Sequence, residues 1–85
     1  MYYAYILESI NTGKHYIGHT QDFAIRLEKH NTGMVKSTKP YRPWIIIRLE
    51  EFGTKTEACR REYEIKSYKG GYKFKELIRR DRIEA

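Results

Sequence analysis

The stretch Trp44 to Phe52, WIIIRLEEF, constrains the fold more strongly than any other part of the chain. Its aromatic and β-branched residues favour a strand, and its unbroken apolar start predicts burial on both faces of a sheet. With 85 residues, the chain is expected to form one domain, residues 1–85, whose core is small but sufficient for independent folding.

Two further strands are predicted before it. Residues 2–7 are aromatic and apolar, residues 11–13 (NTG) are a turn signal, and residues 15–20 return to the strand pattern. Together these segments predict a β-hairpin at the start of the chain.

A first helix is predicted to follow this hairpin. Thr20 is a good N-cap and Asp22 a favourable first-turn charge, so the helix is expected to begin at Thr20 and to end near residues 31–33. Residues 34–43 are polar and contain two prolines, which predicts a loop.

Two more helices are predicted after the long strand. Thr54 and Glu57 have the spacing of a capping box, which opens a helix to about Tyr68. The glycine pair at 70–71 ends it, and a third helix is expected over residues 74–82. The order ββαβαα predicts an α+β fold, with a three-stranded antiparallel sheet flanked by helices.

The charge of the chain indicates a polyanionic partner. Its formal net charge is +6, and basic residues crowd the C-terminal segment. Such a surface attracts nucleic acid, although a solvated helix face is an equally good interpretation of charge alone. A membrane is not expected as a partner, because no strong apolar face accompanies the charge. The basic C-terminal segment contains Lys66, Lys69, Lys73, Lys75, Arg79, Arg80 and Arg82. The residues expected to contact nucleic acid are His19, Lys36, Lys39, Arg42, Lys66, Lys69 and Lys73.

The cellular setting is predicted from three absences. The one cysteine, Cys59, cannot form an internal disulfide, and the N-terminus lacks the pattern of a signal peptide. The longest apolar run, residues 44–47, is too short to cross a membrane. We therefore expect a soluble cytoplasmic protein.

Residues 15–20, HYIGHT, allow more than one interpretation. On a helix, His15 and His19 could share a zinc ion, but on a strand they lie roughly 13 Å apart, at about 3.3 Å per residue, which excludes this. Strand alternation places Tyr16 and Gly18 on one face, where Tyr5 of the neighbouring strand could lie beside Tyr16. Cross-strand tyrosine pairs are also common in ordinary sheets, so the pair alone leaves a structural and a catalytic role open.

Two helical positions add candidate functional groups. Glu62 falls within an apolar arc of the second helix, and a carboxylate there needs a partner, either Lys66 or a bound cation. On the first helix, Arg26 and His30 share a face and could flank the same sheet surface, although for His30 alone an exposed position is the simpler expectation. The apolar arc around Glu62 consists of Ala58, Cys59, Tyr63 and Ile65.

These features together resemble the GIY-YIG nuclease domain. The resemblance rests on tyrosine-x-tyrosine in the first strand, YIG in the second, RLxxH in the first helix and EYEIK in the second. Such domains occur in the bacterial excinuclease, in intron homing endonucleases and in Slx-type nucleases. The resemblance covers nearly the whole chain and is closest to small stand-alone bacterial members, which are also similar in HNTG and STKPYRPW. The chain departs from the family pattern in its first motif, YAY, and in carrying His19 where a lysine often follows YIG.

The resemblance implies a metal-dependent endonuclease that hydrolyses a phosphodiester bond of DNA, with a role in DNA repair or recombination. Its catalytic residues would be Tyr5, Tyr16, Arg26, His30 and Glu62. Tyr16 would take a proton from the attacking water, Tyr5 would orient the water or the phosphate, and Arg26 would offset phosphate charge.

The implied cofactor is one Mg²⁺ or Mn²⁺ ion held by Glu62, since the sequence offers no cluster of carboxylates for two ions. A nucleic-acid-binding domain without catalysis is the alternative. Added DNA affinity is expected from a homodimer or from a protein partner, because the chain contains no further DNA-binding domain.

Overall fold

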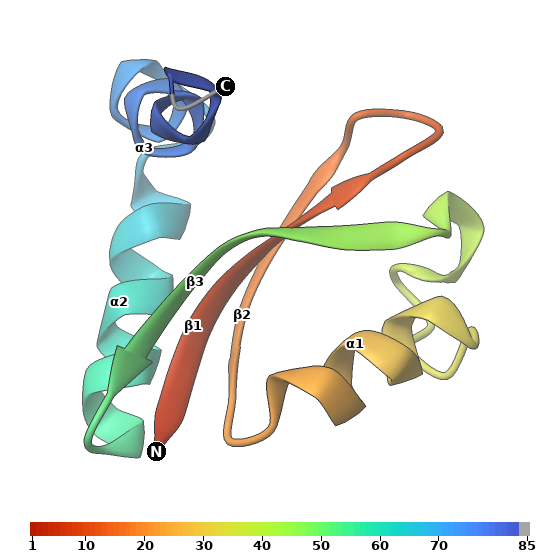
Figure 1. Cartoon of the computed structure of the whole chain (residues 1–85), viewed down its shortest axis with the longest axis horizontal. Coiled ribbons are helices and arrows are strands. Elements are labelled where there is room, and N and C mark those ends of the chain that lie inside the picture. The colour runs from red at the N-terminus through yellow and green to blue at the C-terminus, as the bar shows by residue number, and fades with distance from the viewer. Residues whose placement is uncertain (84–85) are drawn as a thin grey trace.

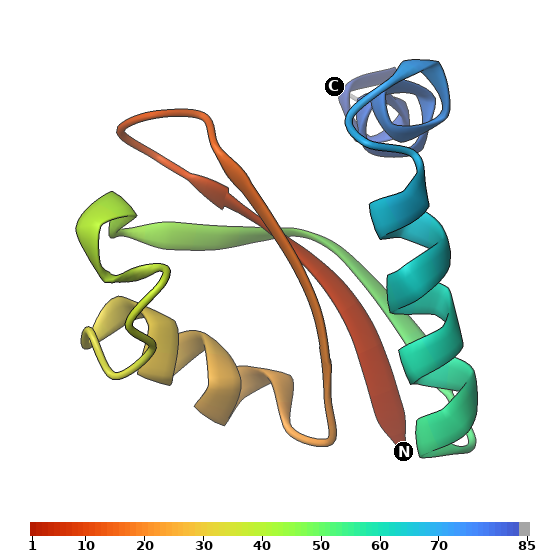
Figure 2. The same cartoon turned by 180° about the vertical axis from the view of Figure 1, so that it is seen from behind.

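The protein folds as a three-stranded antiparallel sheet between two helical layers. The computed structural model describes residues 1–83 and the side chains of residues 1–79. The strand order is β2-β1-β3; α1 lies on one face of the twisted sheet, and α2 with α3 on the other (Figures 1 and 2). In chain order the elements are β1 (Tyr2–Ser9), β2 (His15–Thr20), α1 (Phe23–Asn31), the short 3-10 helix η1 (Lys39–Tyr41), β3 (Trp44–Phe52), α2 (Lys55–Ser67) and α3 (Tyr72–Ile83). The predicted α+β fold of order ββαβαα is confirmed.

Strand β1 is the centre of the core. It pairs with β2 on one side and β3 on the other, so its alternate side chains face helices on both sides of the sheet, and Ala4, Tyr5, Ile6 and Leu7 are all buried. Full burial of an aliphatic side chain of this size stabilises the fold by about 1.5–3 kcal/mol.

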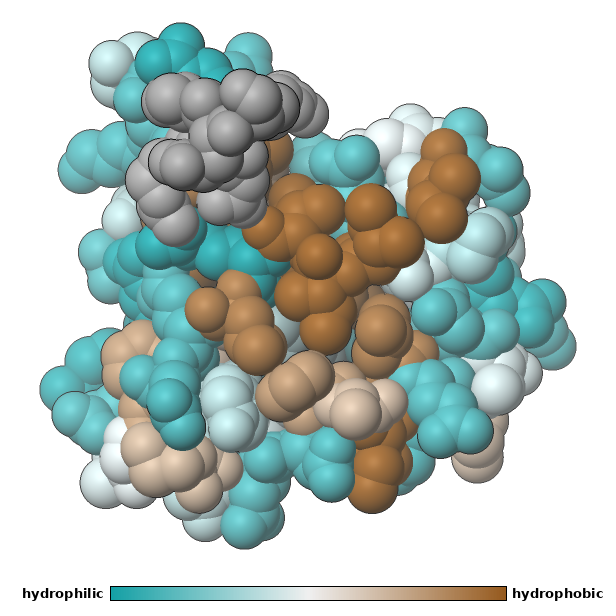
Figure 3. Space-filling view, in the orientation of Figure 1, coloured by the Kyte–Doolittle hydropathy of each residue, from teal (hydrophilic) through white to brown (hydrophobic). Residues whose placement is uncertain are grey.

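Strand β3 does not have the double burial predicted for it. It lies at an edge of the sheet, and α2 packs mainly against β1 and β2, so Ile45 stays 44% exposed. Leu49, which pairs with Tyr5 and lies on the other face of the sheet, is 38% exposed. Apolar side chains accordingly reach the surface in the middle of the molecule in the space-filling view (Figure 3). The prediction was wrong because the apolar run identifies a strand but not its place in the sheet.

The two faces of the sheet carry separate apolar clusters. The cluster on the α1 face is formed by Tyr5, Leu7 and Trp44, with Tyr16 and Leu27 packed against it. The cluster on the α2 face consists of Ile6, Ile65 and Phe74, against which Ile17, Ile47, Tyr68, Leu77 and Ile78 pack. Each face is named after the helix that covers it, the α1 face or the α2 face.

Helix α1 begins later than expected. Asp22, not Thr20, is the N-cap, and its side chain accepts a hydrogen bond of 3.1 Å from the backbone nitrogen of Ile25. Thr20 is held in β2 by its pairing with Tyr3, which keeps it in the sheet and out of the capping position. At the other end, the Asn31 side chain bonds both backbone groups of Trp44, joining the end of α1 to the start of β3.

The C-terminal helices follow their predicted boundaries closely. The capping box of Thr54 and Glu57 is present, and α2 ends at Ser67. Helix α3 begins at Tyr72, two residues before the predicted start. Among the described residues, no helix has the length and apolar character needed to cross a membrane. The side chains of Arg80 and Arg82, part of the predicted basic segment, lie outside the described residues.

Candidate active site at the open edge of the sheet

The two tyrosines of the strand motifs lie side by side on the α1 face. The rings of Tyr5 and Tyr16 have centroids 6.3 Å apart, which confirms the predicted pairing. Gly18 lies opposite Tyr5 in the sheet register, and a β-carbon at Gly18 would be 2.6 Å from the Tyr5 hydroxyl. The glycine of YIG is therefore required because the Tyr5 hydroxyl occupies the space of its missing side chain.

Helix α1 contributes Arg26 and His30 to the same cluster. The Tyr5 hydroxyl lies 3.2 Å from His30 Nε2 and accepts a 3.4 Å hydrogen bond from Arg26 Nε. The His30 ring also packs on Tyr16, with centroids 4.8 Å apart. The expectation of an exposed His30 is wrong: its side chain points to the sheet and is 0% exposed. We call Tyr5, Tyr16, Arg26 and His30 the tyrosine cluster.

Burial keeps two members of this cluster, Tyr5 and His30, neutral. Burial raises the pKa of Tyr5, and the neighbouring Arg26 only partly offsets this. Burial, with a smaller contribution from Arg26, lowers the pKa of His30 to about 4. The hydrogen bond to Tyr5 raises the pKa of Arg26 further, so its guanidinium is the permanent charge of the cluster.

Glu62 lies on the other face of the sheet, on α2, and both of its oxygens are engaged. Oε1 is 2.5 Å from His19 Nδ1, and Oε2 is 2.5 Å from Lys66 Nζ. Burial acts to raise the pKa of Glu62, but the hydrogen bonds from His19 and Lys66 outweigh it and lower that pKa. The Lys66 partner is one of the two alternatives that the sequence left open, whereas the contact between His19 and Glu62 was not predicted.

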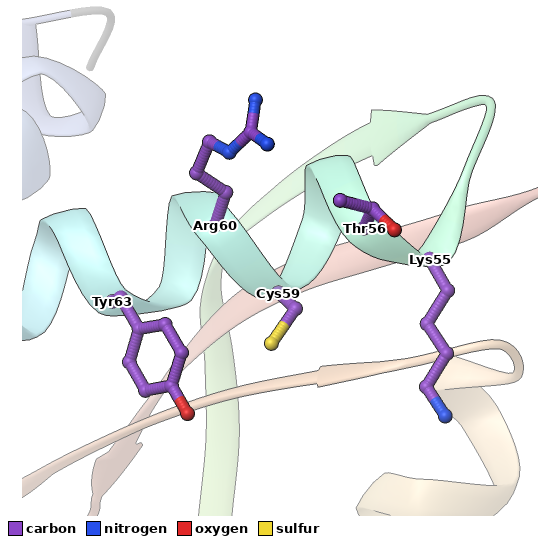
Figure 4. A pocket seen from close by; sticks show the side chains of 5 residues that line it. All are labelled: Lys55, Thr56, Cys59, Arg60 and Tyr63. Carbon is purple, nitrogen blue, oxygen red and sulfur yellow. The ribbon is translucent and has the colours of Figure 1, made fainter.

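The apolar arc around Glu62 is narrower than predicted. Ala58 and Ile65 are buried beside it, but Tyr63 is 67% exposed. In Figure 4 the side chain of Tyr63 points the same way as those of Cys59 and Lys55, and Arg60 points the opposite way. Helical spacing gave the position of Tyr63 relative to Cys59 correctly. Spacing alone does not show how much of the surface of α2 the sheet covers.

The tyrosine cluster and Glu62 approach each other across the free edge of β2. Tyr16 and His19 belong to this strand and face opposite sides of it, toward α1 and α2 respectively. Electrostatic interactions connect the two faces at this edge: the pKa of Lys66 is raised chiefly by Glu62 and to a smaller extent by Tyr16. A phosphodiester lying along this edge could contact both groups.

The chain is similar in sequence to a known protein family. The family model for the GIY-YIG catalytic domain matches residues 1–75. The chain belongs to the GIY-YIG family. Members of this nuclease family generally depend on a divalent metal ion.

Two sets of relatives place the chain among bacterial GIY-YIG proteins. UPF0213 proteins of Staphylococcus aureus strains Mu3 and MW2 are each 43% identical to it over 68 residues, covering 79% of this chain and 82% of theirs. The solution NMR structure of a UPF0213 protein from Bacillus halodurans is 37% identical, covers 91% of this chain and 81% of that one, and aligns with a TM-score of 0.51.

The donor set of this GIY-YIG chain suits a single, mostly hydrated metal ion. Among the residues whose side chains are described, no group of three or more His, Cys, Asp or Glu could hold a metal. Glu62 already accommodates one cation, the Lys66 ammonium, so a divalent ion fits there provided that Lys66 moves aside. A shared zinc ion on His15 and His19 does not fit, because His15 pairs with Glu8 and His19 with Glu62.

Of the seven residues expected to contact nucleic acid, His19 contacts Glu62, and the other six fall into two groups. Lys36, Lys39 and Arg42 are exposed in the loop between α1 and β3, whereas Lys66, Lys69 and Lys73 surround the junction of α2 and α3 (Figure 1). The two groups lie at different ends of the GIY-YIG fold, with the sheet between them.

A further cation, Lys55, was not predicted. It lines a hollow of about 320 Å³ beside His19, together with Tyr2, Thr20 and Gln21. No sequence pattern marks Lys55, because only the packing of α2 against the end of β2 brings it there. A second, shallow hollow of about 360 Å³ on the outer side of α2 contains none of the predicted catalytic residues; it is lined by Lys55, Thr56, Cys59, Arg60 and Tyr63 (Figure 4).

Proposed function

We propose that this protein is an endonuclease that hydrolyses a phosphodiester bond of DNA with the help of one Mg²⁺ or Mn²⁺ ion. Residues 1–85 would act as one nuclease domain in the cytoplasm, in DNA repair or recombination. The main support is the hydrogen-bonded tyrosine cluster on one side of β2, with Glu62 on the other. A tyrosine pair with only a packing role would not need a hydrogen bond from an arginine and a buried, neutral histidine behind it.

The burial of each residue suggests its role. Tyr16 and Arg26 are partly exposed and can meet the substrate. Tyr16, in its phenolate form, would take the proton of the attacking water and become a neutral phenol, and Arg26 would stabilise charge on the phosphate oxygens. Tyr5 is 3% exposed and His30 is fully buried. These two therefore act through Arg26 and Tyr16, which refines the expectation that Tyr5 orients water or phosphate directly.

Glu62 would hold the metal ion, with waters as the remaining ligands. When bound, the ion polarises the scissile phosphate and stabilises the leaving oxygen. His19 contacts the same carboxylate and would fix its orientation. Lys66, released from Glu62, would be free to contact the nucleic acid backbone.

Binding to DNA is expected to be mainly electrostatic, through the two groups of exposed cations described above. The logarithm of the binding constant should fall with the logarithm of salt concentration, with a slope of about −0.9 for each phosphate contacted. Fluorescence anisotropy with a labelled oligonucleotide measures this slope, and an affinity independent of salt would contradict the proposal. A homodimer or a protein partner would add to this affinity.

The decisive test is the Tyr16→Phe variant, which keeps the ring and removes one hydroxyl. Cleavage of a panel of branched, nicked and single-stranded substrates should fall about 10²–10⁴-fold, while folding and DNA binding persist. Glu62→Ala should also abolish cleavage, but only this variant should regain part of it at high Mn²⁺. Cleavage by Tyr16→Phe close to that of the wild type would refute the mechanism.

The alternative is a nucleic-acid-binding domain without catalysis. One observation favours it: Glu62 is already satisfied by His19 and Lys66 and needs no metal for its charge. This alternative predicts salt-dependent binding by the wild type without cleavage of any substrate in the panel, with or without Mg²⁺ or Mn²⁺.

A further inference from the structure

Thr38 is a buried polar residue directly behind the Tyr5–His30 pair. It lies in the loop between α1 and β3, just before η1, and is 2% exposed. Its hydroxyl oxygen is 2.8 Å from His30 Nδ1, and its carbonyl oxygen accepts a 3.0 Å hydrogen bond from Trp44 Nε1. The backbone of Thr38 is thus anchored to the core of the α1 face, and its hydroxyl is aimed at the histidine.

Arg26, Tyr5, His30 and Thr38 form a hydrogen-bonded network. The direction of each hydrogen bond in this network follows from Arg26. A guanidinium can only donate, so Arg26 Nε donates to the Tyr5 oxygen, and the Tyr5 proton must go to another atom. Among the described residues, the acceptor within reach of that hydroxyl is His30 Nε2, at 3.2 Å. Nε2 must therefore be unprotonated, which places the proton of the neutral imidazole on Nδ1.

Thr38, at the opposite end of this network, also places the proton of His30 on Nδ1. The Thr38 hydroxyl lies 3.3 Å from the carbonyl oxygen of Val35, which can only accept, so the hydroxyl donates there. Its oxygen is then available to accept from His30 Nδ1. Because burial keeps the pKa of His30 near 4, the ring carries a single proton at neutral pH, and that proton faces Thr38.

We infer that Thr38 is a positioning residue of the nuclease site: its hydroxyl holds His30 in the Nδ1–H tautomer, which directs the Tyr5 proton to His30 and leaves the Tyr5 oxygen facing Arg26. Thr38 thereby acts on the phosphate-binding guanidinium through two intervening side chains. The effect on cleavage rests on the proposed function, whereas the tautomer is a property of the folded chain alone.

Long-range ¹H–¹⁵N correlation spectra of the imidazole at neutral pH distinguish the two tautomers directly. The wild type should show the Nδ1–H form. Thr38→Val keeps the volume but leaves a buried Nδ1–H without an acceptor, so His30 should shift to the Nε2–H form. Thr38→Ser keeps the hydroxyl and should retain Nδ1–H. An Nε2–H tautomer in the wild type, or an unchanged Nδ1–H tautomer in Thr38→Val, would overturn the inference.

Cleavage provides the second readout. Thr38→Val should lower kcat about 10-fold to 100-fold with little change in KM, because Arg26 is misplaced rather than removed, and Thr38→Ser should restore it. Full activity of a Thr38→Val protein whose tautomer has switched would refute the positioning role.

The two proposals fail in different ways. Absence of cleavage by every protein, with the tautomers as expected, would refute the nuclease function while the hydrogen-bond assignment stands. If Thr38→Val does not fold, the spectra of the wild type and of Thr38→Ser decide, since Nε2–H in either one contradicts the assignment.

Discussion

The two sides of β2 hold their functional groups by different means. On the α1 side, the tyrosine cluster is fixed by buried hydrogen bonds between mostly neutral groups, ending at Thr38. On the α2 side, Glu62 is held by two charged or chargeable partners, of which Lys66 is 49% exposed. Buried neutral networks place atoms accurately, whereas partly exposed ion pairs exchange partners at little cost. The first side is thus suited to orienting groups, and the second to receiving a cation.

The largest expected contrast between the α1 face and the α2 face concerns their effect on stability at low pH. His30 is neutral when folded, with a pKa of about 4 against an ordinary 6.5, so the unfolded chain takes up its proton first as the pH falls. Stability should therefore be full above pH 6.5 and decline by about 3 kcal/mol on acidification to pH 4. The lowered pKa of Glu62 acts in the same direction, but only below its ordinary value of 4.5.

Urea unfolding at a series of pH values measures this decline. His30→Gln should be less stable at neutral pH but should show a flatter profile between pH 6.5 and 5. His15→Gln, which removes a histidine paired with Glu8 at the surface, is the matched control and measures the contribution of a surface histidine to the same slope. A flat wild-type profile in that range would show that His30 is not buried in its neutral form.

The second contrast concerns tolerance to added volume. Gly18→Ala would place a methyl group 2.6 Å from the Tyr5 hydroxyl, and that ring is packed in the core, so we expect a loss of about 1–3 kcal/mol. Gly53→Ala is the control, because the nearest atom to its new methyl group is 3.9 Å away. Equal stability of the two variants in urea unfolding would argue that the tyrosine cluster can shift freely.

The smallest expected effect is on the side of Glu62. Lys66→Met should cost only about 0.2–1 kcal/mol, because the pair is partly exposed and screened by solvent. On the proposed metal site, the same change should strengthen Mn²⁺ binding, seen as NMR line broadening around Glu62 at lower Mn²⁺ concentrations. Lys75→Met removes the same charge from α3 and should not alter this. Weaker Mn²⁺ binding by Lys66→Met would contradict competition between Lys66 and the metal.

The sequence predicted those parts of the site that depend on local periodicity. Strand alternation placed Tyr5 beside Tyr16, and helical spacing placed Arg26 with His30 and Glu62 inside an apolar arc. Contacts between distant segments were not predictable in this way. The burial of His30 depends on a loop that folds back over α1, and the contact between His19 and Glu62 joins residues 43 positions apart.

Thr38 and β3 illustrate the same limit. Thr38 lies in a loop without periodicity, and nothing in its neighbours indicates that its hydroxyl meets His30. The apolar run of β3 predicted a strand correctly, but central and edge strands differ in what packs over them, and that is decided by the helices. Edge position left Ile45 exposed despite its apolar neighbours.

The position of Tyr5 on the central strand has an evolutionary consequence. Its ring belongs to the core while its hydroxyl belongs to the candidate site, so selection for folding alone would keep an aromatic residue at this position. Glu62 does not combine a packing role with a role in the site, since its loss would leave the apolar contacts of Ala58 and Ile65 in place. A lineage released from nuclease activity should therefore first lose its acidic residue on α2 and retain the aromatic ring on β1 long after it has ceased to cut.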